Sequence, residues 1–519
     1  MYDDRVIIRF LLSFLHGLES LKTALIAPYS DISAIGVRTL SSILKSEGHD
    51  VRLIFLPYQV SEIEYTPDFV FRYDHSILDH VYELVKDYKV IGISLMTNYF
   101  EHAVDITTFL KDKGIKGKII WGGIHPTLSP EDCLDHVDTV CLGEADEAYP
   151  EYLNKFASGG NVTDTKNFYF KIDEKIIKNE LRSPVQVLDI IPNQDYSLED
   201  DWVLNPHENR LFKMTPELLQ KYLTRGSATK KRGLLFYQTV TSRGCPYKCA
   251  FCCWSKIKEI QPDCKKLRRR SPANVVGELK DILEKYPFFK EITFSDDSFF
   301  GSAIDYIEEF SKLYKKEIRL PFQCLAGPTT ITREKMELFV DAGMKNIQIG
   351  MQAASKRILQ LYNRPTTLEK MKETTEIVHS YIPLIHPPIY DFILDNPYET
   401  KNEVIETLKF IHGIPQPFFL QIFSLVFFPG TKLYEMGVKD NFIKDHVSDV
   451  IRKQYNLRKI NYLNIMFSIL GHGFPKWMTA ILLNALVIKI LDNKIFNHLY
   501  RFVYFLYRKV FLGLKNIKD

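Results

Sequence analysis

Two series of alternating strands and helices, joined by a polar stretch, predict an α/β chain with two sheet domains. In the first series, residues 21–157, continuous apolar runs alternate with helical stretches of about ten residues, as in a doubly wound parallel sheet. In the second series, residues 233–436, six such units follow within about 200 residues, which indicates a partial (β/α)6 barrel of the TIM type. Residues 437–519 are predicted to be helical.

The bulk composition is that of a globular protein with little charge bias. Hydrophobic residues make up 45% and charged residues 25% of the chain, and the formal net charge is +3. This balance gives no reason to expect a nucleic-acid partner. The first residues carry Asp3 and Asp4 ahead of an apolar run that contains Arg9, unlike a secretory signal. The 8 cysteines do not form a disulfide framework, so we expect a cytoplasmic protein.

The first domain follows a lead segment, residues 1–20. Its apolar runs predict strands at 22–29, 50–57, 89–97, 118–123 and 138–144. Between them, helices are expected at 35–48, 82–88, 102–114 and 129–137. Ligands of such sheets bind beyond the carboxyl ends of the strands.

In residues 158–232 the alternation of strands and helices stops, and these residues are predicted to form a connector. It includes a small hairpin at 167–180 and a basic turn-rich stretch at 227–233. In the barrel series that follows, strands are expected at 234–242, 291–295, 321–326, 346–350, 389–394 and 420–428. The predicted helices lie at 272–286, 302–316, 331–342, 354–378 and 400–412. Barrel active sites lie at the carboxyl ends of the strands.

The stretch RGCPYKCAFCCW, residues 243–254, directly follows the first barrel strand and contains four cysteines. A zinc site would need a second Cys or His pair, and none is spaced for it. A dithiol redox pair of Cys249 and Cys252 would leave Cys245 unexplained. The C-x3-C-x2-C spacing of these three fits the ligands of a 4Fe-4S cluster with one open iron. The fourth, Cys253, is expected to point elsewhere and to be structural.

This spacing, with Phe251 just before the third cysteine, resembles the signature of the radical S-adenosylmethionine (SAM) superfamily. The resemblance implies that the open iron chelates SAM and that an injected electron cleaves SAM to a 5′-deoxyadenosyl radical. It also implies an external one-electron reductant of the flavodoxin or ferredoxin type.

Further stretches of the barrel resemble SAM-binding segments of the same superfamily. FSDDSF places Asp296 and Asp297 where that superfamily holds the methionine amine, with a helix N-cap as the alternative role. IQIGMQAASKRIL resembles the strand-four segment and supplies Gly350 and Gln352, where a Glu is more usual. ILDNPYETKNEV supplies Asp395 in place of a small residue.

The first domain resembles the cobalamin-binding Rossmann-like domain that precedes many radical SAM barrels. The resembling segments supply a set of candidate cobalamin contacts: Ser94, Thr97, Asn98, Gly122, Gly123, His125, Gly143 and Glu144. The DxHxxG motif that provides a cobalt ligand in other cobalamin domains is absent, so we expect His125 to pack against the cofactor or a turn. A methylthiotransferase would carry three further cysteines in this part, whereas residues 1–244 hold only Cys133 and Cys141.

The carboxyl-terminal tail, residues 476–519, is basic and amphipathic. Lys494, Arg501, Arg508 and Lys515 recur every seven residues and form one helical stripe. Opposite that stripe lie Leu499, Val503, Leu506 and Val510, with Phe502 on the flank. Such a helix can lie in a membrane interface. A helix that caps the barrel with its apolar face is the alternative.

The resemblance implies a cobalamin-dependent methyltransferase that acts on an unactivated carbon of a small-molecule or lipid substrate. Ring formation or another rearrangement by an enzyme of the same architecture is a second hypothesis. A cofactor-binding sensor without catalysis is a third. The protein is expected in the cytoplasm, with a peripheral membrane location if the tail binds lipid.

Overall fold

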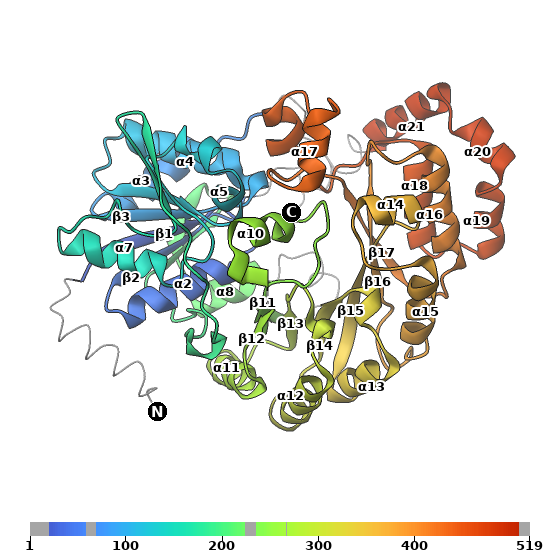
Figure 1. The fold of residues 1–519 in the computed structure, drawn as a ribbon, viewed down its shortest axis with the longest axis horizontal. Helices are drawn as coiled ribbons and strands as arrows, with labels where there is room; N and C mark the ends of the chain where they lie inside the picture. Colours follow the sequence, from blue (N-terminus) through green and yellow to red (C-terminus); the bar gives the residue numbers. More distant parts are fainter. Residues whose placement is uncertain (1–19, 59–68, 224–234, 266, 508–519) are drawn as a thin grey trace.

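The computed structural model describes residues 20–58, 69–223, 235–265 and 267–507. Two sheets stand side by side, the first at the left of Figure 1 and the second at its centre, and helices follow at the upper right. Several predictions lie outside the described residues: most of the lead segment, the basic stretch 227–233, Arg508, Val510 and Lys515.

The first sheet has the strand order β7-β6-β5-β4-β3-β1-β2-β8-β9. Its parallel strands include β1 (Lys22–Ala27), β2 (Asp50–Phe55), β3 (Val90–Ser94), β4 (Lys118–Gly122) and β5 (Thr139–Cys141). The helices of this domain are α2 (Ile35–Ser46), α3 (His75–Val85), α4 (Phe100–Asp112), α5 (Ile124–Leu128), α6 (Pro130–Leu134) and α7 (Ala148–Ala157). Leu25 packs into one apolar cluster and Ile26 into another, so both faces are covered, as predicted.

The connector extends this sheet at both edges. Its strands are β6 (Phe168–Ile172), β7 (Lys175–Lys178), β8 (Asp201–Asn205) and β9 (Arg210–Lys213), followed by α8 (Pro216–Leu223). β6 and β7 form the predicted hairpin, while β8 pairs in parallel with β2. The sequence pattern did not indicate β8 and β9, because these short strands lie in a polar stretch without a continuous apolar run.

The second sheet is parallel, with the order β10-β13-β14-β15-β16-β17. Its strands are β10 (Phe236–Thr239), β13 (Glu291–Phe294), β14 (Phe322–Ala326), β15 (Met344–Gln352), β16 (Ile389–Leu394) and β17 (Phe419–Ser424). Its helices are α11 (Pro272–Lys285), α12 (Ile304–Glu317), α13 (Arg333–Ala342), α14 (Lys356–Leu361), α15 (Leu368–His379) and α16 (Lys401–Gly413). β10 and β17 are the two edges, which confirms the predicted partial barrel.

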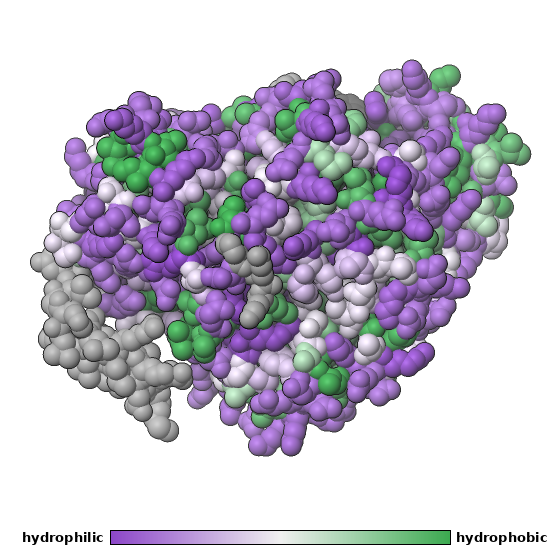
Figure 2. Space-filling view, viewed as in Figure 1, coloured by the Kyte–Doolittle hydropathy of each residue, from purple (hydrophilic) through white to green (hydrophobic). Residues whose placement is uncertain are grey.

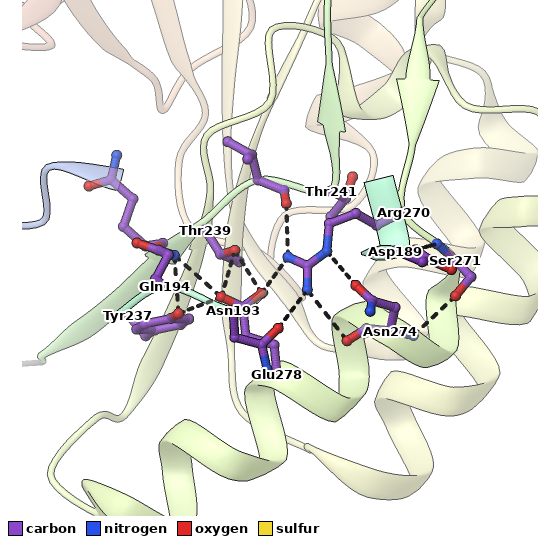
Figure 3. A network of polar contacts seen from close by, with 12 residues as sticks. Asp189, Asn193, Gln194, Tyr237, Thr239, Thr241, Arg270, Ser271, Asn274 and Glu278 are labelled. Carbon is purple, nitrogen blue, oxygen red and sulfur yellow. Dashed lines mark hydrogen bonds and ion pairs between the residues drawn. The ribbon is translucent and has the colours of Figure 1, made fainter. Parts of the chain in front are cut away.

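Between β10 and α11 the chain forms a small hairpin and a helix: β11 (Ser242–Arg243), α10 (Cys253–Ile260) and β12 (Arg268–Arg269). A polar network near this point ties the connector to the barrel (Figure 3). Glu278 of α11 is buried, accepts a hydrogen bond from Tyr237 Oη and pairs with Arg270. Gln194 of the connector donates to Gln238 O at 3.0 Å. These contacts hold β10, the strand that leads into the cysteine loop.

The carboxyl-terminal region consists of α17 (Lys432–Lys439), α18 (Tyr462–Gly471), α19 (Lys476–Leu482), α20 (Ala485–Leu491) and α21 (Lys494–Tyr507). α18 packs against α16 and β17, and α19 contacts α16 and α18. In the described part of the chain, none of the helices combines the length and apolar character needed to span a bilayer.

Candidate active site

The cysteine loop lies between β11 and α10 and is anchored to the barrel by its backbone. Ala250 N donates to Tyr362 O at 2.9 Å, and Leu433 N donates to Ala250 O at the same distance. Asn363 Nδ2 donates to Lys248 O at 2.8 Å. These bonds fix the middle of the loop against segments that follow β15 and β17, so the loop geometry depends on the whole barrel.

The three predicted cluster ligands, Cys245, Cys249 and Cys252, lie around this loop. Burial raises the pKa of the Cys245 thiol to about 11 and also raises that of Cys249. Among the residues that the structure describes, no three Cys, His, Asp or Glu side chains converge tightly enough to hold one metal ion. A 4Fe-4S cluster with one open iron takes three thiolates, each bound to a different iron.

Two cations approach these thiols from outside the motif. Lys258 is only 4% exposed, donates Nζ to Tyr247 O at 2.6 Å, and its charge acts on all three cysteines. Arg364 donates Nη1 to Cys249 Sγ at 3.4 Å and Nη2 to Gly350 O at 2.6 Å. Nearby positive charge stabilises thiolates, the form of cysteine that binds iron. The sequence pattern did not single out either cation, because folding brings them to the loop.

Cys253 is the first residue of α10 and lines the large cavity described below. It also belongs to an apolar cluster with Ile257 of α10 and Leu128 of the first domain. The Cys253 thiol also interacts with the Cys252 thiol, contrary to the expectation that Cys253 points elsewhere. Its structural role stays a prediction.

The two acids after β13 have different surroundings. Asp296 is buried and accepts hydrogen bonds from Thr241 N at 3.0 Å, Thr241 Oγ1 at 2.8 Å and Ser242 Oγ. It therefore holds the turn that leads into the cysteine loop. Asp297 is more exposed and accepts a hydrogen bond of 2.6 Å from Trp254 Nε1. Neither acid caps α12, whose N-cap residue is Ala303.

The residues predicted on β15 border the cysteine loop. Gln352 has a positive φ of 73° and lines, with Phe251, a small cavity of about 330 Å³. A Cβ atom at Gly350 would lie 2.6 Å from Gln352 Nε2 and 3.0 Å from Arg364 Nη2, so a side chain there would displace both. Phe251 packs edge-on against Tyr362, with ring centroids 5.0 Å apart.

Asp395, the third acid predicted to contact SAM, follows β16 and has a φ of 60°. Its carboxylate accepts hydrogen bonds from Ser424 Oγ at 2.9 Å, Lys459 N at 3.0 Å and Asn464 Nδ2 at 2.8 Å. These partners give Asp395 a clear role in fastening the carboxyl-terminal region to the barrel. Its contact with SAM stays a prediction.

A cavity of about 880 Å³ lies between the strand ends of the first sheet and the cysteine loop. Phe251, Cys252, Cys253 and Trp254 form part of one wall. Most of the predicted cobalamin contacts line the opposite part: Ser94, Thr97, Asn98, Gly123, Gly143 and Glu144. Gly122 and His125 are not part of the lining.

At Gly123 the cavity wall requires a backbone conformation and a close approach that only glycine allows. Gly123 has a φ of 101°, and a Cβ atom there would lie 2.8 Å from Leu95 O, so glycine is required. His125 is fully buried behind the wall, with Nδ1 3.1 Å from Thr97 Oγ1. Burial lowers the pKa of His125 to about 4, and Nε2 lies 4.0 Å from Asp132 Oδ2. His125 thus supports Thr97, which does line the cavity.

Glu144 joins the two domains through ion pairs. Its carboxylate contacts Arg268 and lies 3.2 Å from Arg243 Nη1. Arg243 also binds Asp146 at 2.6 Å. Because Arg243 comes two residues before Cys245, this network connects the first domain directly to the cysteine loop. The sequence pattern suggested Glu144 as a cofactor contact but did not indicate these arginines.

Comparison with known proteins agrees with this geometry. Residues 239–411 match the model of the radical SAM superfamily, and residues 21–153 match the B12 binding domain. This chain is a radical SAM protein with a B12-binding domain. The predicted recognition is therefore confirmed, and the domains imply a 4Fe-4S cluster, SAM and cobalamin as cofactors. The cavity between the domains and the thiols along its wall fit these groups.

The relatives of this radical SAM protein include methyltransferases and cyclases. An uncharacterized methyltransferase of Pyrococcus horikoshii is 24% identical over 69% of this chain and 71% of the relative. Bacteriochlorophyllide d C-8(2)-methyltransferase of Chlorobaculum tepidum is 21% identical over 67% and 68%. Anaerobic magnesium-protoporphyrin IX monomethyl ester cyclase of Rubrivivax gelatinosus is 21% identical over 58% and 50%.

Two solved structures share the fold. The cobalamin-dependent SAM radical enzyme OxsB, with aqua-cobalamin and SAM bound, matches with a TM-score of 0.59 at 18% identity over 86% of this chain. The match spans 58% of the OxsB chain. The radical SAM methyltransferase TsrM of Kitasatospora setae, with tryptophan and a SAM analog bound, matches with a TM-score of 0.60 at 14% identity, covering 81% of this chain and 76% of TsrM.

Proposed function

We propose that this protein is a cobalamin-dependent radical SAM methyltransferase that methylates an unactivated carbon of a hydrophobic substrate. The observation that carries the proposal is the single cavity of about 880 Å³ bordered by both the B12-binding strand ends and the cysteine loop. A molecule in this cavity contacts both walls at once. The family matches and the methyltransferase relatives support the same activity.

When bound, the cluster with SAM supplies radical chemistry and cobalamin supplies a transferable methyl group. The chain's part is to hold and orient these groups and to exclude water. Cys245, Cys249 and Cys252 hold the cluster, while Lys258 and Arg364 provide positive charge beside them.

Residues around the loop hold the remaining groups in this proposal. Phe251, Asp297, Gly350 and Gln352 border SAM, and Asp296 and Asp395 position the segments beside it. Ser94, Thr97, Asn98, Gly123 and Gly143 face cobalamin. Thr97 is positioned by His125 behind it.

Product analysis tests this proposal. Anaerobically reconstituted protein is incubated with SAM, a one-electron reductant of the flavodoxin type and candidate hydrophobic substrates. Methyl transfer predicts both 5′-deoxyadenosine and S-adenosylhomocysteine. 5′-Deoxyadenosine without S-adenosylhomocysteine would instead indicate the cyclase, a class represented among the relatives. Protein with a fully loaded cluster that forms neither 5′-deoxyadenosine nor S-adenosylhomocysteine would indicate a sensor.

We also propose that the protein is cytoplasmic and binds a membrane surface through α19, α20 and α21. Large apolar side chains on the outer side of these helices are at least half exposed: Trp477, Ile481, Leu486, Ile490, Ile495, Leu499, Phe502 and Val503. In Figure 2, hydrophobic residues gather at the right-hand edge, where α20 lies in Figure 1. Lys476, Lys489, Lys494 and Arg501 supply positive charge on the same helices. A basic amphipathic surface of this kind suits anionic lipid.

The inner side of the same helices packs on the barrel domain. Ile488 is buried, and Thr479 Oγ1 lies 3.0 Å from His412 Nδ1 of α16. The sequence presented lipid binding and capping of the barrel by the apolar face as alternatives. Leu499 and Val503 of that apolar face are at least half exposed, so these helices contact the barrel through other residues.

A further inference from the structure

A short segment of the carboxyl-terminal region crosses from the first domain to the barrel beside the large cavity. Arg452 Nε binds Glu101 Oε1 of α4 at 2.7 Å, and both side chains are mostly buried. Tyr455 O accepts a hydrogen bond of 2.7 Å from Ser424 N at the end of β17. Lys453 lies between these two anchors and lines the cavity. Its position is thus fixed from both sides.

The charge of Lys453 has no direct partner among the described residues. Asp395 and Asp449 are the carboxylates whose charge acts on it. The Asp395 carboxylate is already held by three hydrogen-bond donors of β17 and the following segment. Asp449 Oδ2 accepts hydrogen bonds from the backbone N–H groups of Lys444 and Asp445. Neither carboxylate lies within ion-pair distance of the Lys453 ammonium.

The cavity wall on the barrel side of Lys453 is apolar. Val426, Phe428 and Val450 line it, and Tyr455 adds an aromatic ring. The other charged side chains of the lining belong to the first domain: Glu144 is ion-paired, and Asp31 accepts a hydrogen bond from Ser33 N. Lys453 is therefore a cation in partly apolar surroundings, where a bound anion is favoured.

We propose that Lys453 binds a carboxylate or phosphate group of the molecule held in the cavity, beside an apolar wall that takes a hydrocarbon portion. The proposal rests on the proposed function, and where the anion belongs to the substrate it specifies the substrate class as a hydrophobic acid. Two molecules supply such an anion: the substrate itself, and cobalamin through its phosphodiester. Lys453 lies outside both family-model matches, so neither family model assigns it a role.

The test uses the full chain with its cluster reconstituted and compares Lys453→Met, Lys453→Arg and the control Lys439→Met, which removes an exposed lysine of α17. Equilibrium dialysis measures dodecanoate and its uncharged analogue dodecanol on cobalamin-loaded protein. A second arm measures hydroxocobalamin and cobinamide, which lacks the phosphodiester. Cleavage of SAM to 5′-deoxyadenosine is followed in the same preparations.

We expect Lys453→Met to weaken binding of one of the two anion-bearing ligands by about tenfold or more, as for loss of a charge-assisted hydrogen bond. Binding of the counterpart that lacks the anion, dodecanol or cobinamide, should be unchanged. Lys453→Arg and Lys439→Met should bind like the wild type. Selective loss of dodecanoate binding would assign the anion to the substrate. Selective loss of hydroxocobalamin binding would assign it to the cofactor. Equal loss of binding for a ligand with the anion and its counterpart without it, or no loss in either pair, would overturn the proposal. Absence of SAM cleavage in the wild type with the selectivity intact would reject the proposed function instead.

Discussion

At the residue scale, the cysteine loop is defined as much by the cations around it as by its three thiols. Lys258 and Arg364 place positive charge next to the ligands from α10 and from the segment after α14. A cluster held by three thiolates carries excess negative charge, and its reduction adds one more. Buried positive charge therefore favours the reduced cluster, because net charge and hydrogen bonds to sulfur set the potential.

Replacing Lys258 tests this reasoning. In Lys258→Met we expect the midpoint potential of the reconstituted cluster to fall, whereas Lys258→Arg, which keeps the charge, should stay near the wild type. The potential is measured by redox titration followed by electron paramagnetic resonance. Iron and sulfide content serves as the control for cluster loading. An unchanged potential in fully loaded Lys258→Met would show that its charge does not act on the cluster.

The sequence predicted the residues whose chemistry depends on local spacing and missed those brought in by folding. Cys245, Cys249 and Cys252 lie within eight consecutive positions, so their spacing alone indicates a cluster. Lys258 needs helix α10 to turn it toward the loop, and Lys453 needs the crossing segment after α17. No local pattern distinguishes these two from the other lysines of the chain.

At the element scale, the hairpin of β11 and β12 couples the two domains. Arg243 of β11 and Arg268 of β12 both contact Glu144, which follows β5 of the first sheet. Arg268 is 3% exposed and Glu144 18%, so both charges are largely removed from water. Removal of one partner leaves the other buried without its counter-charge.

A double-mutant cycle measures this coupling. Arg268→Met alone is expected to destabilise the protein by about 3 kcal/mol, since Glu144 keeps only Arg243. Arg268→Met with Glu144→Gln should be less destabilised than the sum of the single variants, by about 1 kcal/mol or more. The free energy of unfolding of each variant is measured by urea denaturation of the first domain, followed by tryptophan fluorescence. If the destabilisation of the double variant equals the sum of the two single values, the ion pair contributes no coupling free energy.

Element prediction succeeded where the apolar pattern was continuous. All strands of the barrel lie within or next to the predicted runs, because both faces of a parallel sheet are buried. The helix expected at residues 82–88 instead begins at His75, after Asp74, which accepts a hydrogen bond from Ser76 N as its N-cap. β8 and β9 were missed because their pairing with the first sheet is set by tertiary contacts.

At the scale of the whole molecule, the cavity and the exposed apolar helices lie at different places. In the proposed function the cavity holds the substrate and cofactors, and the helices bind a membrane surface. The cavity borders both domains, whereas α19, α20 and α21 lie beyond the far side of the barrel (Figure 1). A hydrophobic substrate and a membrane-binding region are consistent with each other, because a lipid surface supplies and retains such molecules.

Lipid binding by these helices is tested with a double variant, Ile495→Ser with Leu499→Ser, side chains that are 80% and 50% exposed. We expect reduced co-sedimentation with vesicles that contain anionic lipid, because apolar area is lost from the contact. Ile172→Ser with Ile176→Ser removes comparable exposed side chains from the β6–β7 hairpin and should bind normally. Equal vesicle binding by the two double variants would show that α21 does not take part in the membrane contact.

In the proposed function, three of the four clustered cysteines hold a cluster that supports SAM cleavage. The most direct measurement is 5′-deoxyadenosine formation, with iron content, in anaerobically reconstituted Cys245→Ala and Cys253→Ala. We predict that Cys245→Ala loses both the cluster and the product. Cys253→Ala, which alters a neighbour in the same loop, should keep both. SAM cleavage retained by Cys245→Ala would contradict the account.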